Sequence, residues 1–413
     1  MTGRSVLFIH PVAAFGGASR SLLELLRGFP AGAVEPRIVL PRGQAAELFE
    51  RERYRILKVR GIAQFDCTRF GHYRGLRWLI LLRELWFLPF TAWGIVRARR
   101  LWPEVEVIHV NEITALPAAL LAKALFRRPL VVHVRSVQQD RGMPLRRGLV
   151  ERLLRRHADA VIAIDETVRA SLPSPIAATV VHNGFTPAET GGSAAVTAFQ
   201  SGLHEGALRV GMVGNLLSLK GVFDFLEAAR ICVGRGVNVD FVIVGGNPRR
   251  LTGLKGALLE ALGFARDVEA DVGRFVAQHR LQDRVHRLGF TPEISAIYRC
   301  LDVICFPSHL DAVGRPVLEA AWFGVPSIAA VDRPSPDTFI PGETGVQVPA
   351  RNPEALASAI ERLSQHRDEV RRMGGAALRL ARENFDSRKN ALRVLEVYER
   401  LQPQGPVKPA TGR

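Results

Sequence analysis

A stretch late in the chain, residues 309–326, combines residue types that suit binding of a phosphorylated ligand. It reads HLDAVGRPVLEAAWFGVP, with Asp311 in a loop ahead of Gly314, Pro316 and Glu319. Proline suits a first helical position, so we expect a helix to begin here with Glu319 in its first turn. Backbone N–H groups at a helix N-terminus bind anions, and a carboxylate further along accepts hydrogen bonds from hydroxyl groups. An ordinary helix start, whose glutamate complements the helix dipole, explains this stretch about as well.

A second candidate anion site lies near the N-terminus. Residues 5–10 predict a strand, and the following FGGASRSLLELLRGF has leucines at helical spacing. Gly16 and Gly17 would let a phosphate or a sugar approach the backbone, because neither carries a Cβ atom. The full Gly-x-Gly-x-x-Gly motif is absent, and a tight strand-to-helix turn accounts for the two glycines equally well.

The elements that would position these residues alternate along the whole chain. Apolar strand-like runs separated by helical patterns occupy residues 5–10, 37–41, 54–59, 104–111, 129–135, 158–164, 208–215, 239–246, 284–290, 302–308, 326–331 and 345–349. This alternation predicts an α/β protein with a doubly wound parallel sheet in each half. Ligands bind at the carboxyl ends of strands in such folds, and Asn111, His133, Arg135 and Asp165 fall at those ends.

Two domains are predicted from a change in composition. Around residues 187–206 the sequence turns to Ala, Gly, Ser and Thr with little periodicity, which indicates a linker at 189–206. The domains are then 1–188 and 207–385. A last helical pattern at 386–403 can pack on either domain or across both, and the tail 404–413 is expected to be disordered.

The segment 69–102 is unusual in composition. It holds four of the five tryptophans among leucines and arginines: Trp78, Trp86, Trp93, Trp102, Arg69, Arg74, Arg77, Arg97, Arg99 and Arg100. We favour one or two amphipathic helices packed on the core of the first domain, with some contact with an anionic membrane, since Trp and Arg suit the interface. Peripheral docking as the main role and a transmembrane helix are the alternatives, and Arg83, Glu84 and Pro89 oppose the latter.

Charge and cysteine usage narrow the class of protein. A net charge of +16 over 413 residues favours anionic partners, and no zinc-finger, RNA-recognition or basic-zipper pattern points to nucleic acid. The cysteines Cys67, Cys232, Cys300 and Cys305 show neither metal-site spacing nor the density of a disulfide scaffold. They indicate reduced, mostly buried thiols. The first apolar run is too short for a signal peptide, so we expect a cytoplasmic protein, at the inner face of the plasma membrane.

Five segments together resemble the retaining glycosyltransferases of family 4. They are FGGASRSLLELL at 15–26, VVHNGF at 180–185, GMVGNLLSLKG at 211–221, CLDVICFPSHLDAVGRPVLEAAWFGVPSIA at 300–329 and PGETGVQVP at 341–349. The resemblance covers nearly the whole chain in the right order. It implies the GT-B fold of two facing Rossmann-like domains and a nucleoside-diphosphate sugar as donor.

The resemblance also implies roles for residues around position 311. The family signature of Glu, seven residues and Glu is Asp311, seven residues and Glu319 here. The first acid would hold hydroxyls of the donor sugar, with Asp one methylene shorter than Glu, and the second would hold the ribose. The family's Phe-Gly in this loop is Val313 and Gly314, and the glycine N–H would face the diphosphate.

Further donor-binding positions follow from the segment 211–221. Lys220 matches a cation on the donor phosphates, although a solvated loop lysine is the alternative. Asn215 stands where the family has a second phosphate cation, and Arg315 is our hypothesis for a substitute. Leu288 to Phe290 resembles the loop that receives the nucleobase.

In the N-terminal domain, the family places a histidine near the reacting sugar. The run PLVVHVR offers Arg135 at the strict position and His133 as the alternative. A buried structural histidine is at least as good an interpretation of His133, and a better one of His10, His109 and His182.

The mechanism and the acceptor are further expectations, which rest on the sequence and on the family resemblance. No Asp-x-Asp pair occurs in the sequence, so we expect catalysis without a metal and with no cofactor besides the donor. The acceptor is expected to be a glycan, carried on a lipid, in cell-surface polysaccharide or lipopolysaccharide synthesis. A sugar-nucleotide 2-epimerase of similar fold and a non-catalytic anion-binding or nucleic-acid-binding protein are the alternatives.

Overall fold

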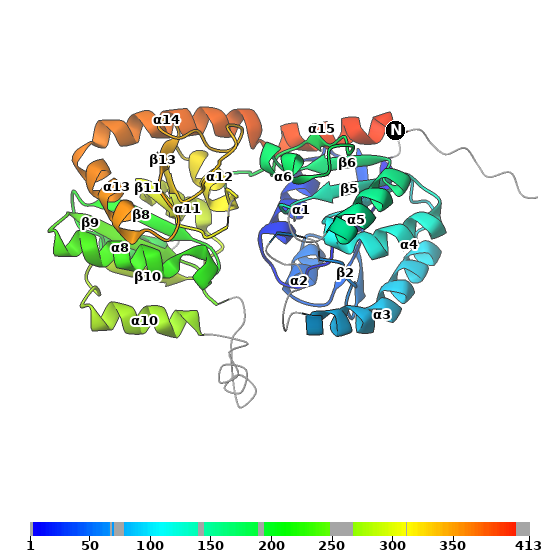
Figure 1. Cartoon of the computed structure of the whole chain (residues 1–413), viewed down its shortest axis with the longest axis horizontal. Coiled ribbons are helices and arrows are strands. Elements are labelled where there is room, and N and C mark those ends of the chain that lie inside the picture. The colour runs from blue at the N-terminus through cyan, green and yellow to red at the C-terminus, as the bar shows by residue number, and fades with distance from the viewer. Residues whose placement is uncertain are drawn as a thin grey trace, which may run out of the picture. The chain divides into compact units, whose positions relative to one another are not determined.

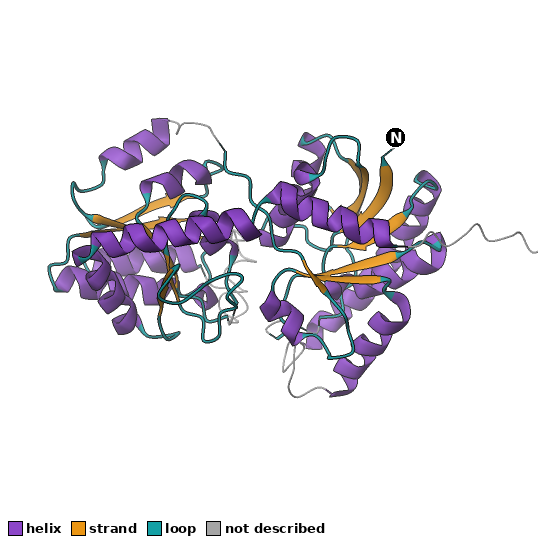
Figure 2. Cartoon of the chain, turned by 90° about the horizontal axis from the view of Figure 1, so that it is seen from above, coloured by secondary structure: helices purple, strands orange, loops and turns teal. Residues whose placement is uncertain are grey.

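The computed structural model describes residues 3–66, 68–69, 78–138, 144–188, 194–247, 267–310 and 312–401. The chain divides into two compact units. Unit 1 comprises Met1–Phe185 with Phe385–Arg413, and unit 2 comprises Thr186–Asn384. In each unit, helices cover both faces of a parallel sheet (Figure 1 and Figure 2). The predicted pair of doubly wound sheets is confirmed.

The sheet of unit 1 has the strand order β3-β2-β1-β4-β5-β6-β7, all parallel among the described residues. Its strands are β1 (Arg4–Ile9), β2 (Val34–Pro41), β3 (Arg55–Val59), β4 (Val107–Val110), β5 (Leu130–Val134), β6 (Ala160–Ala163) and β7 (Thr179–Val180). The order reverses between β1 and β4. The loops after these two strands therefore flank the position where doubly wound sheets bind ligands.

Helices pack on both faces of this sheet because the last four residues of β1, Val6 to Ile9, are all apolar and buried. Val6 and Phe8 point into one core, whereas Leu7 and Ile9 point into the other. The first core is covered by α1 (Gly17–Gly28), α2 (Gln44–Arg51) and α15 (Ser387–Arg400). On the second face and around it lie α3 (Leu79–Leu101), η2 (Ile113–Ala115), α4 (Leu116–Phe126), α5 (Pro144–His157) and α6 (Glu166–Ser171).

Unit 2 repeats the topology with the strand order β10-β9-β8-β11-β12-β13. Its strands are β8 (Leu208–Val213), β9 (Val239–Val244), β10 (Val285–Gly289), β11 (Val303–Phe306), β12 (Ser327–Ala329) and β13 (Gly345–Gln347). Its helices are α7 (Ala194–Ser201), η3 (Ser218–Lys220), α8 (Val222–Gly234), α10 (Val268–Gln278), α11 (Ile294–Cys300), α12 (Arg315–Ala321), α13 (Pro353–Gln365) and α14 (Arg367–Asn384). Here the order reverses between β8 and β11.

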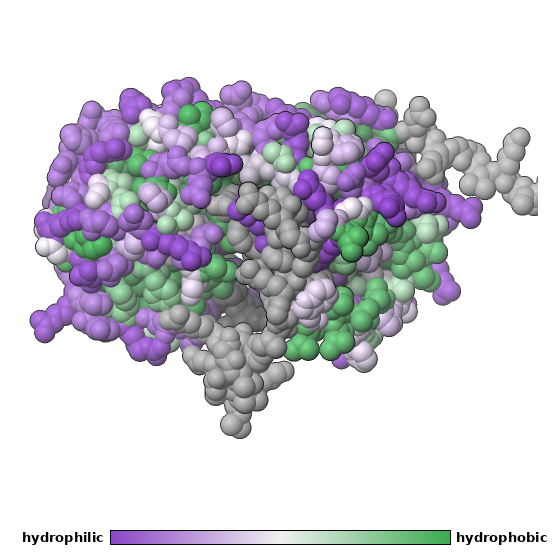
Figure 3. All heavy atoms as spheres, viewed as in Figure 1, coloured by the Kyte–Doolittle hydropathy of each residue, from purple (hydrophilic) through white to green (hydrophobic). Residues whose placement is uncertain are grey.

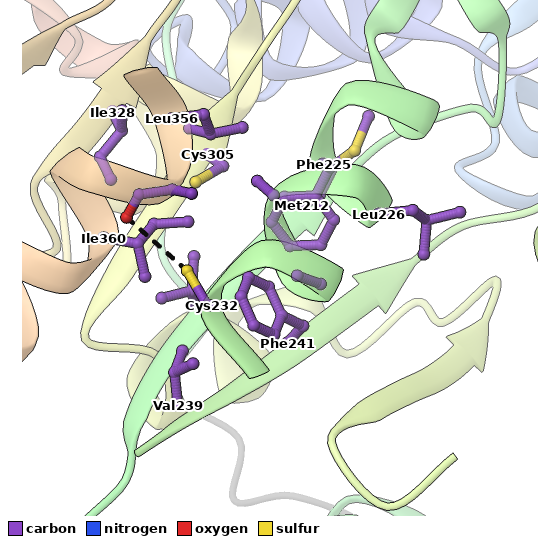
Figure 4. Close-up of a cluster of buried hydrophobic side chains, with 14 of the residues drawn as sticks. Met212, Phe225, Leu226, Cys232, Val239, Phe241, Cys305, Ile328, Leu356 and Ile360 are labelled. Carbon is purple, nitrogen blue, oxygen red and sulfur yellow. Dashed lines mark hydrogen bonds between the residues drawn. The ribbon is translucent and has the colours of Figure 1, made fainter. Parts of the chain in front are cut away.

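The main core of unit 2 lies between the sheet and helices α8 and α13. Figure 4 shows Met212 and Phe241 of the sheet together with Phe225 of α8 in this core. Cys232 donates its S–H to the carbonyl of Ala357, and burial raises the pKa of its thiol to about 12. The three described cysteines are free and buried, as the sequence predicts. Cys67 lies outside the described residues.

Two segments differ from the sequence-based expectation. The stretch 189–206, predicted as a linker, contains α7 of unit 2, because Val196 packs into the core beneath it despite the weak periodicity. Within the described part of the segment 69–102, the long helix α3 buries only a narrow stripe, whereas we expected an amphipathic face packed on the core. The C-terminal helix α15 packs against α1 within unit 1, and residues 402–413 lie outside the described part.

Candidate functional site

Three glycine loops meet at the carboxyl edge of the sheet in unit 2. The N–H of Gly214 donates to the carbonyl of Val244 across 2.9 Å, and that of Gly245 donates to the carbonyl of Gly289 across 2.7 Å. A Cβ atom at Gly245 would lie 1.9 Å from the carbonyl oxygen of Gly214, and Gly245 has φ +129°. Only glycine allows this backbone contact. The loops after β8, β9 and β10 therefore form one backbone-lined edge.

The loop after β8 also packs on the loop after β11. Gly221 has φ +76°, and a Cβ atom there would lie 1.8 Å from the carbonyl oxygen of Pro307. The N–H of His309 donates to the carbonyl of Leu219. These contacts hold Lys220 with its Nζ 5.5 Å from the centre of the Phe306 ring, and burial lowers the pKa of Lys220. The predicted phosphate cation therefore lies at the switch point of the sheet.

Phe306 brings a second predicted residue to the same place. A Cβ atom at Gly314 would lie 2.6 Å from two carbons of the Phe306 ring, so the glycine backbone rests directly on the ring. Gly314 is the N-cap of α12. Lys220 and Gly314, which are 94 positions apart in the sequence, thus contact one aromatic side chain.

The helix α12 begins one residue earlier than the sequence indicates. It starts at Arg315, so Pro316 is its second residue and Glu319 lies in its second turn rather than its first. The reason is the extended N-cap conformation of Gly314, with φ −96° and ψ 166°, which lets Arg315 enter the helix. Asp311, the first acid of the predicted pair, lies outside the described residues.

Glu319 is buried and held on both sides. Its Oε1 accepts a hydrogen bond from Nε of Arg315 across 2.9 Å, and its Oε2 accepts one from the hydroxyl of Tyr298 across 3.0 Å. Arg315, our hypothetical substitute for a phosphate cation, thus forms an ion pair with Glu319. Nothing in the sequence around Tyr298 on α11 distinguishes it from a core residue, and sequence reasoning missed it.

The remaining donor-binding candidates of unit 2 lie in the loops after β8, β10 and β11. Asn215 is exposed in the loop after β8, and Phe290 follows β10 with 76% of its surface exposed. Val313 is half-buried and packs on the cluster around Phe306. An exposed phenylalanine beside the Gly289 loop offers an apolar face of the kind on which a flat ring can stack.

In unit 1, Arg135 lies beyond β5 and is held by two asparagines. Its Nε and Nη2 donate to Oδ1 of Asn111 across 3.0 and 2.8 Å, and its Nη1 donates to Oδ1 of Asn183 across 2.6 Å. Its Nη2 lies 3.3 Å from Nδ1 of His133. The guanidinium is therefore fixed at the carboxyl edge of the sheet by neutral acceptors.

Three buried histidines behind Arg135 are neutral. Burial, with a smaller contribution from Arg135, lowers the pKa of His10 and of His109 to about 3 and that of His133 well below its usual range. His109 lies 3.2 Å from Nδ1 of His133 and 2.6 Å from the hydroxyl of Tyr398. Because Arg135 donates to Nδ1 of His133, the proton of this ring is on Nε2, which has no hydrogen-bond partner among the described residues.

Glu112 is an ionisable group that sequence reasoning missed. It directly follows Asn111, and its carboxylate accepts hydrogen bonds from Ile113 N and from the hydroxyl of Ser136. Burial outweighs these bonds and raises its pKa to about 7. Its position two residues after β4 is the signal that could have found it.

Other predicted positions of unit 1 have clear local roles. Gly16 caps α1 in an extended conformation, with open space where a Cβ atom would lie, and Gly17 is the first residue of α1. Asp165 caps α6 by accepting a hydrogen bond from Val168 N, so its role is explained by the helix start. His10 bonds to Ser19 and Asn111, which ties the loops after β1 and β4 together.

One cluster in unit 2 has the residue types of a metal site. Oδ1 of the buried Asp240 lies 2.8 Å from His204, 3.4 Å from His286 and 3.7 Å from Nη1 of Arg284. These residues lie at the amino edge of the sheet, opposite the glycine loops. Because Arg284 already places a positive charge beside the carboxylate, we interpret the cluster as a structural ion-pair network.

Two protein families match the chain in succession. The model described as Glycosyltransferase Family 4 matches residues 15–189, and the model described as Glycosyl transferases group 1 matches residues 196–379. The chain is 28% identical over 331 residues to the lipopolysaccharide core biosynthesis mannosyltransferase LpcC of Rhizobium leguminosarum bv. viciae, covering 79% of this chain and 84% of that protein. It is 27% identical over 319 residues to the D-inositol 3-phosphate glycosyltransferase of Mycobacteroides abscessus, covering 71% and 66%.

Among solved structures, the chain resembles HepE from Anabaena in complex with UDP and glucose. The TM-score is 0.73 at 20% sequence identity, covering 96% of this chain and 99% of HepE. At this identity the likeness establishes the fold, in which two Rossmann-like units follow one another in a single chain.

Proposed function

The chain belongs to the GT-B glycosyltransferases of family 4, and we propose that it transfers a sugar from a nucleoside-diphosphate sugar to a lipid-linked glycan in the synthesis of cell-surface polysaccharide or lipopolysaccharide. The match to a lipopolysaccharide core mannosyltransferase over most of both chains supports the acceptor class. HepE, crystallised with UDP and glucose, supports the donor class.

One contact carries the assignment of the donor to unit 2. The Phe306 ring lies against Gly314 and beneath Lys220, at the switch point where doubly wound sheets bind nucleotides. A cation and a backbone N–H that converge there suit a diphosphate. Glu319, fixed by Tyr298 and Arg315, would receive the ribose hydroxyls. Asp311 would hold the donor sugar.

We further propose retention of configuration without a metal. The bond between the anomeric carbon and the diphosphate oxygen breaks, and the diphosphate leaves with the electron pair. The acceptor oxygen bonds to the same face of the sugar, and its proton passes to an oxygen of the departing phosphate. Lys220 would stabilise the negative charge that develops on this leaving group.

Unit 1 would bind the acceptor. Arg135 presents a fixed positive charge at the carboxyl edge of its sheet, and His133 lies behind it. Because burial lowers the pKa of His133 well below its usual range, we assign it no role as a second cation near neutral pH. We therefore propose that Arg135 orients the acceptor or steadies negative charge, with His133 as its support.

The decisive experiment is a thermal-shift screen of the purified protein against nucleoside-diphosphate sugars. Selective stabilisation by one donor, lost in Lys220→Ala and in Glu319→Gln, would support the assignment, because a ligand that binds the folded state raises the melting temperature. Glu396→Gln, on α15 of unit 1, is the matched control and should keep the shift. Turnover of the donor without acceptor would favour an epimerase instead, and loss of transfer in EDTA would overturn the proposed metal independence.

A further inference from the structure

Helix α3 of unit 1 exposes most of its large apolar side chains and buries two polar ones. Its buried residues are Glu84, Thr91, Gly94, Ile95 and Ala98. Large apolar side chains of the helix and its N-cap are exposed instead: Trp78, Leu79, Leu82, Leu85, Trp86, Leu88, Trp93, Val96 and Leu101. A helix on a water-exposed surface normally turns its apolar stripe inward. A contiguous exposed apolar face of this size indicates a surface that contacts something other than water.

The buried stripe fixes α3 to the rest of unit 1 through polar contacts. Oε2 of Glu84 accepts a hydrogen bond from the backbone N–H of Gln64 across 2.7 Å, and Oγ1 of Thr91 accepts one from that of Ala63 across 2.8 Å. A Cβ atom at Gly94 would lie 2.5 Å from Val59, so the helix packs closely on β3. By length and composition alone α3 could cross a membrane. Spanning would strip Glu84 and Thr91 of these partners, which argues for a helix that stays attached to unit 1.

Positive charge borders the exposed apolar face. The guanidinium of Arg60 lies over the rings of Trp86 and Phe90, at 5.7 and 5.2 Å from their centres. That of Arg97 lies 5.4 Å from the ring centre of Trp93. The sequence of α3 contains one acidic residue, Glu84, which is buried and paired with Arg83. The exposed charges of the helix are therefore all positive.

An exposed apolar face bordered by positive charge matches one kind of partner. Figure 3 shows hydrophobic side chains gathered over α3, near the lower right of unit 1. Indole rings favour the boundary between headgroups and acyl chains, and arginines beside them pair with anionic phosphates. Two copies of this face would oppose arginine to arginine, which disfavours a dimer through it.

We propose that α3 docks the protein flat on an anionic phospholipid surface, with its exposed Trp and Leu side chains inserted at the headgroup boundary. Lipid binding follows from α3 itself. That this lipid binding brings unit 1 to a lipid-borne acceptor rests on the proposed function.

Vesicle co-sedimentation of the full-length protein tests the inference. Binding to phosphatidylcholine vesicles containing phosphatidylglycerol should exceed binding to phosphatidylcholine alone and should fall with added salt. The combined change Leu82→Ser, Leu85→Ser and Trp86→Ser should lower the affinity roughly tenfold or more, since three inserting side chains are lost. Leu392→Ser removes another exposed leucine, from α15, and should leave binding unchanged. Melting curves establish that each variant is folded.

Three outcomes would overturn the docking surface. They are no binding to anionic vesicles at low salt, binding that the triple variant leaves intact, and a dimer in solution that the triple variant dissociates. Brominated lipids add a readout of depth, since they should quench the tryptophan fluorescence of the wild type and quench Trp86→Phe less. If vesicle binding holds and no donor stabilises the protein, the proposed function fails while this surface stands.

Discussion

Tyr298 on α11 donates its hydroxyl hydrogen to Oε2 of Glu319 on α12 across 3.0 Å, inside the core of unit 2. Arg315 holds the other carboxylate oxygen. Since a carboxylate bound on both oxygens by protein groups has a fixed plane, Tyr298 sets the direction in which Glu319 can accept hydroxyls from a ligand.

Tyr298→Phe should therefore weaken donor binding without abolishing transfer. Removing the hydroxyl leaves a buried carboxylate oxygen without this donor, which costs about 1–3 kcal/mol of stability. The donor KM should rise several-fold while kcat changes little, because the reacting groups are untouched. Steady-state kinetics with varied donor, together with a melting curve, separates the two effects. A lower melting temperature with an unchanged donor KM would show that Tyr298 has a structural role alone.

Gly314→Ala should be far more harmful than its size suggests. The new methyl group would lie 2.6 Å from the Phe306 ring, so the loop that holds Lys220 and Gly314 must move. We expect kcat/KM to fall roughly tenfold or more, since small displacements of positioning groups cost this much. Gly234→Ala, which meets no atom within 4 Å, is the control. Phe306→Leu in the Gly314→Ala background should restore part of the activity, and failure to do so would refute the clash.

Much of the fold could be predicted because its strands are short apolar runs of fixed period. The strand ends at Asn111, Arg135 and Asn215 were therefore located correctly along the sequence. Because these strands are buried on both faces, each can be recognised in the sequence as a continuous apolar run without knowledge of its neighbours. The helix start at Gly314 was missed by one residue, because the N-cap conformation rather than the proline decides it.

What the sequence could not supply is the pairing of distant residues. Tyr298 and Phe306 sit in ordinary core patterns, and their contacts with Glu319 and Lys220 arise only when separate elements pack. The polarity of α3 was obscured for the same reason. Glu84 is buried because the backbone N–H of Gln64, distant along the chain, satisfies its carboxylate.

As the pH rises, activity that depends on the protonated ammonium of Lys220 should be lost at a lower pH than if this lysine were exposed. Burial lowers the pKa of Lys220, so its charge is lost earlier as the pH rises. The alkaline limb of kcat/KM should shift upward in Lys220→Arg, which stays charged, whereas Lys220→Ala should lose roughly 100-fold in kcat. Circular dichroism over the same range controls for unfolding. An identical alkaline limb in wild type and Lys220→Arg would assign the limb to another group.

The stability of unit 1 should fall steeply in acid because of His10 and His109. Between pH 6.5 and about 3 each binds a proton when unfolded but not when folded, so stability decreases as the pH falls. Glu112 acts in the opposite sense between pH 4.5 and about 7, where the folded state alone holds its proton. The loss of stability should therefore be steepest below pH 4.5.

Two variants test this pH dependence. His10→Gln should reduce the slope of stability against pH by about 1.4 kcal/mol per pH unit, and Glu112→Gln should steepen that slope above pH 4.5. Hydrogen exchange of the β1 and β4 amides measures the stability of unit 1 against pH in both variants. Parallel stability curves for wild type and His10→Gln would show that His10 is not held neutral.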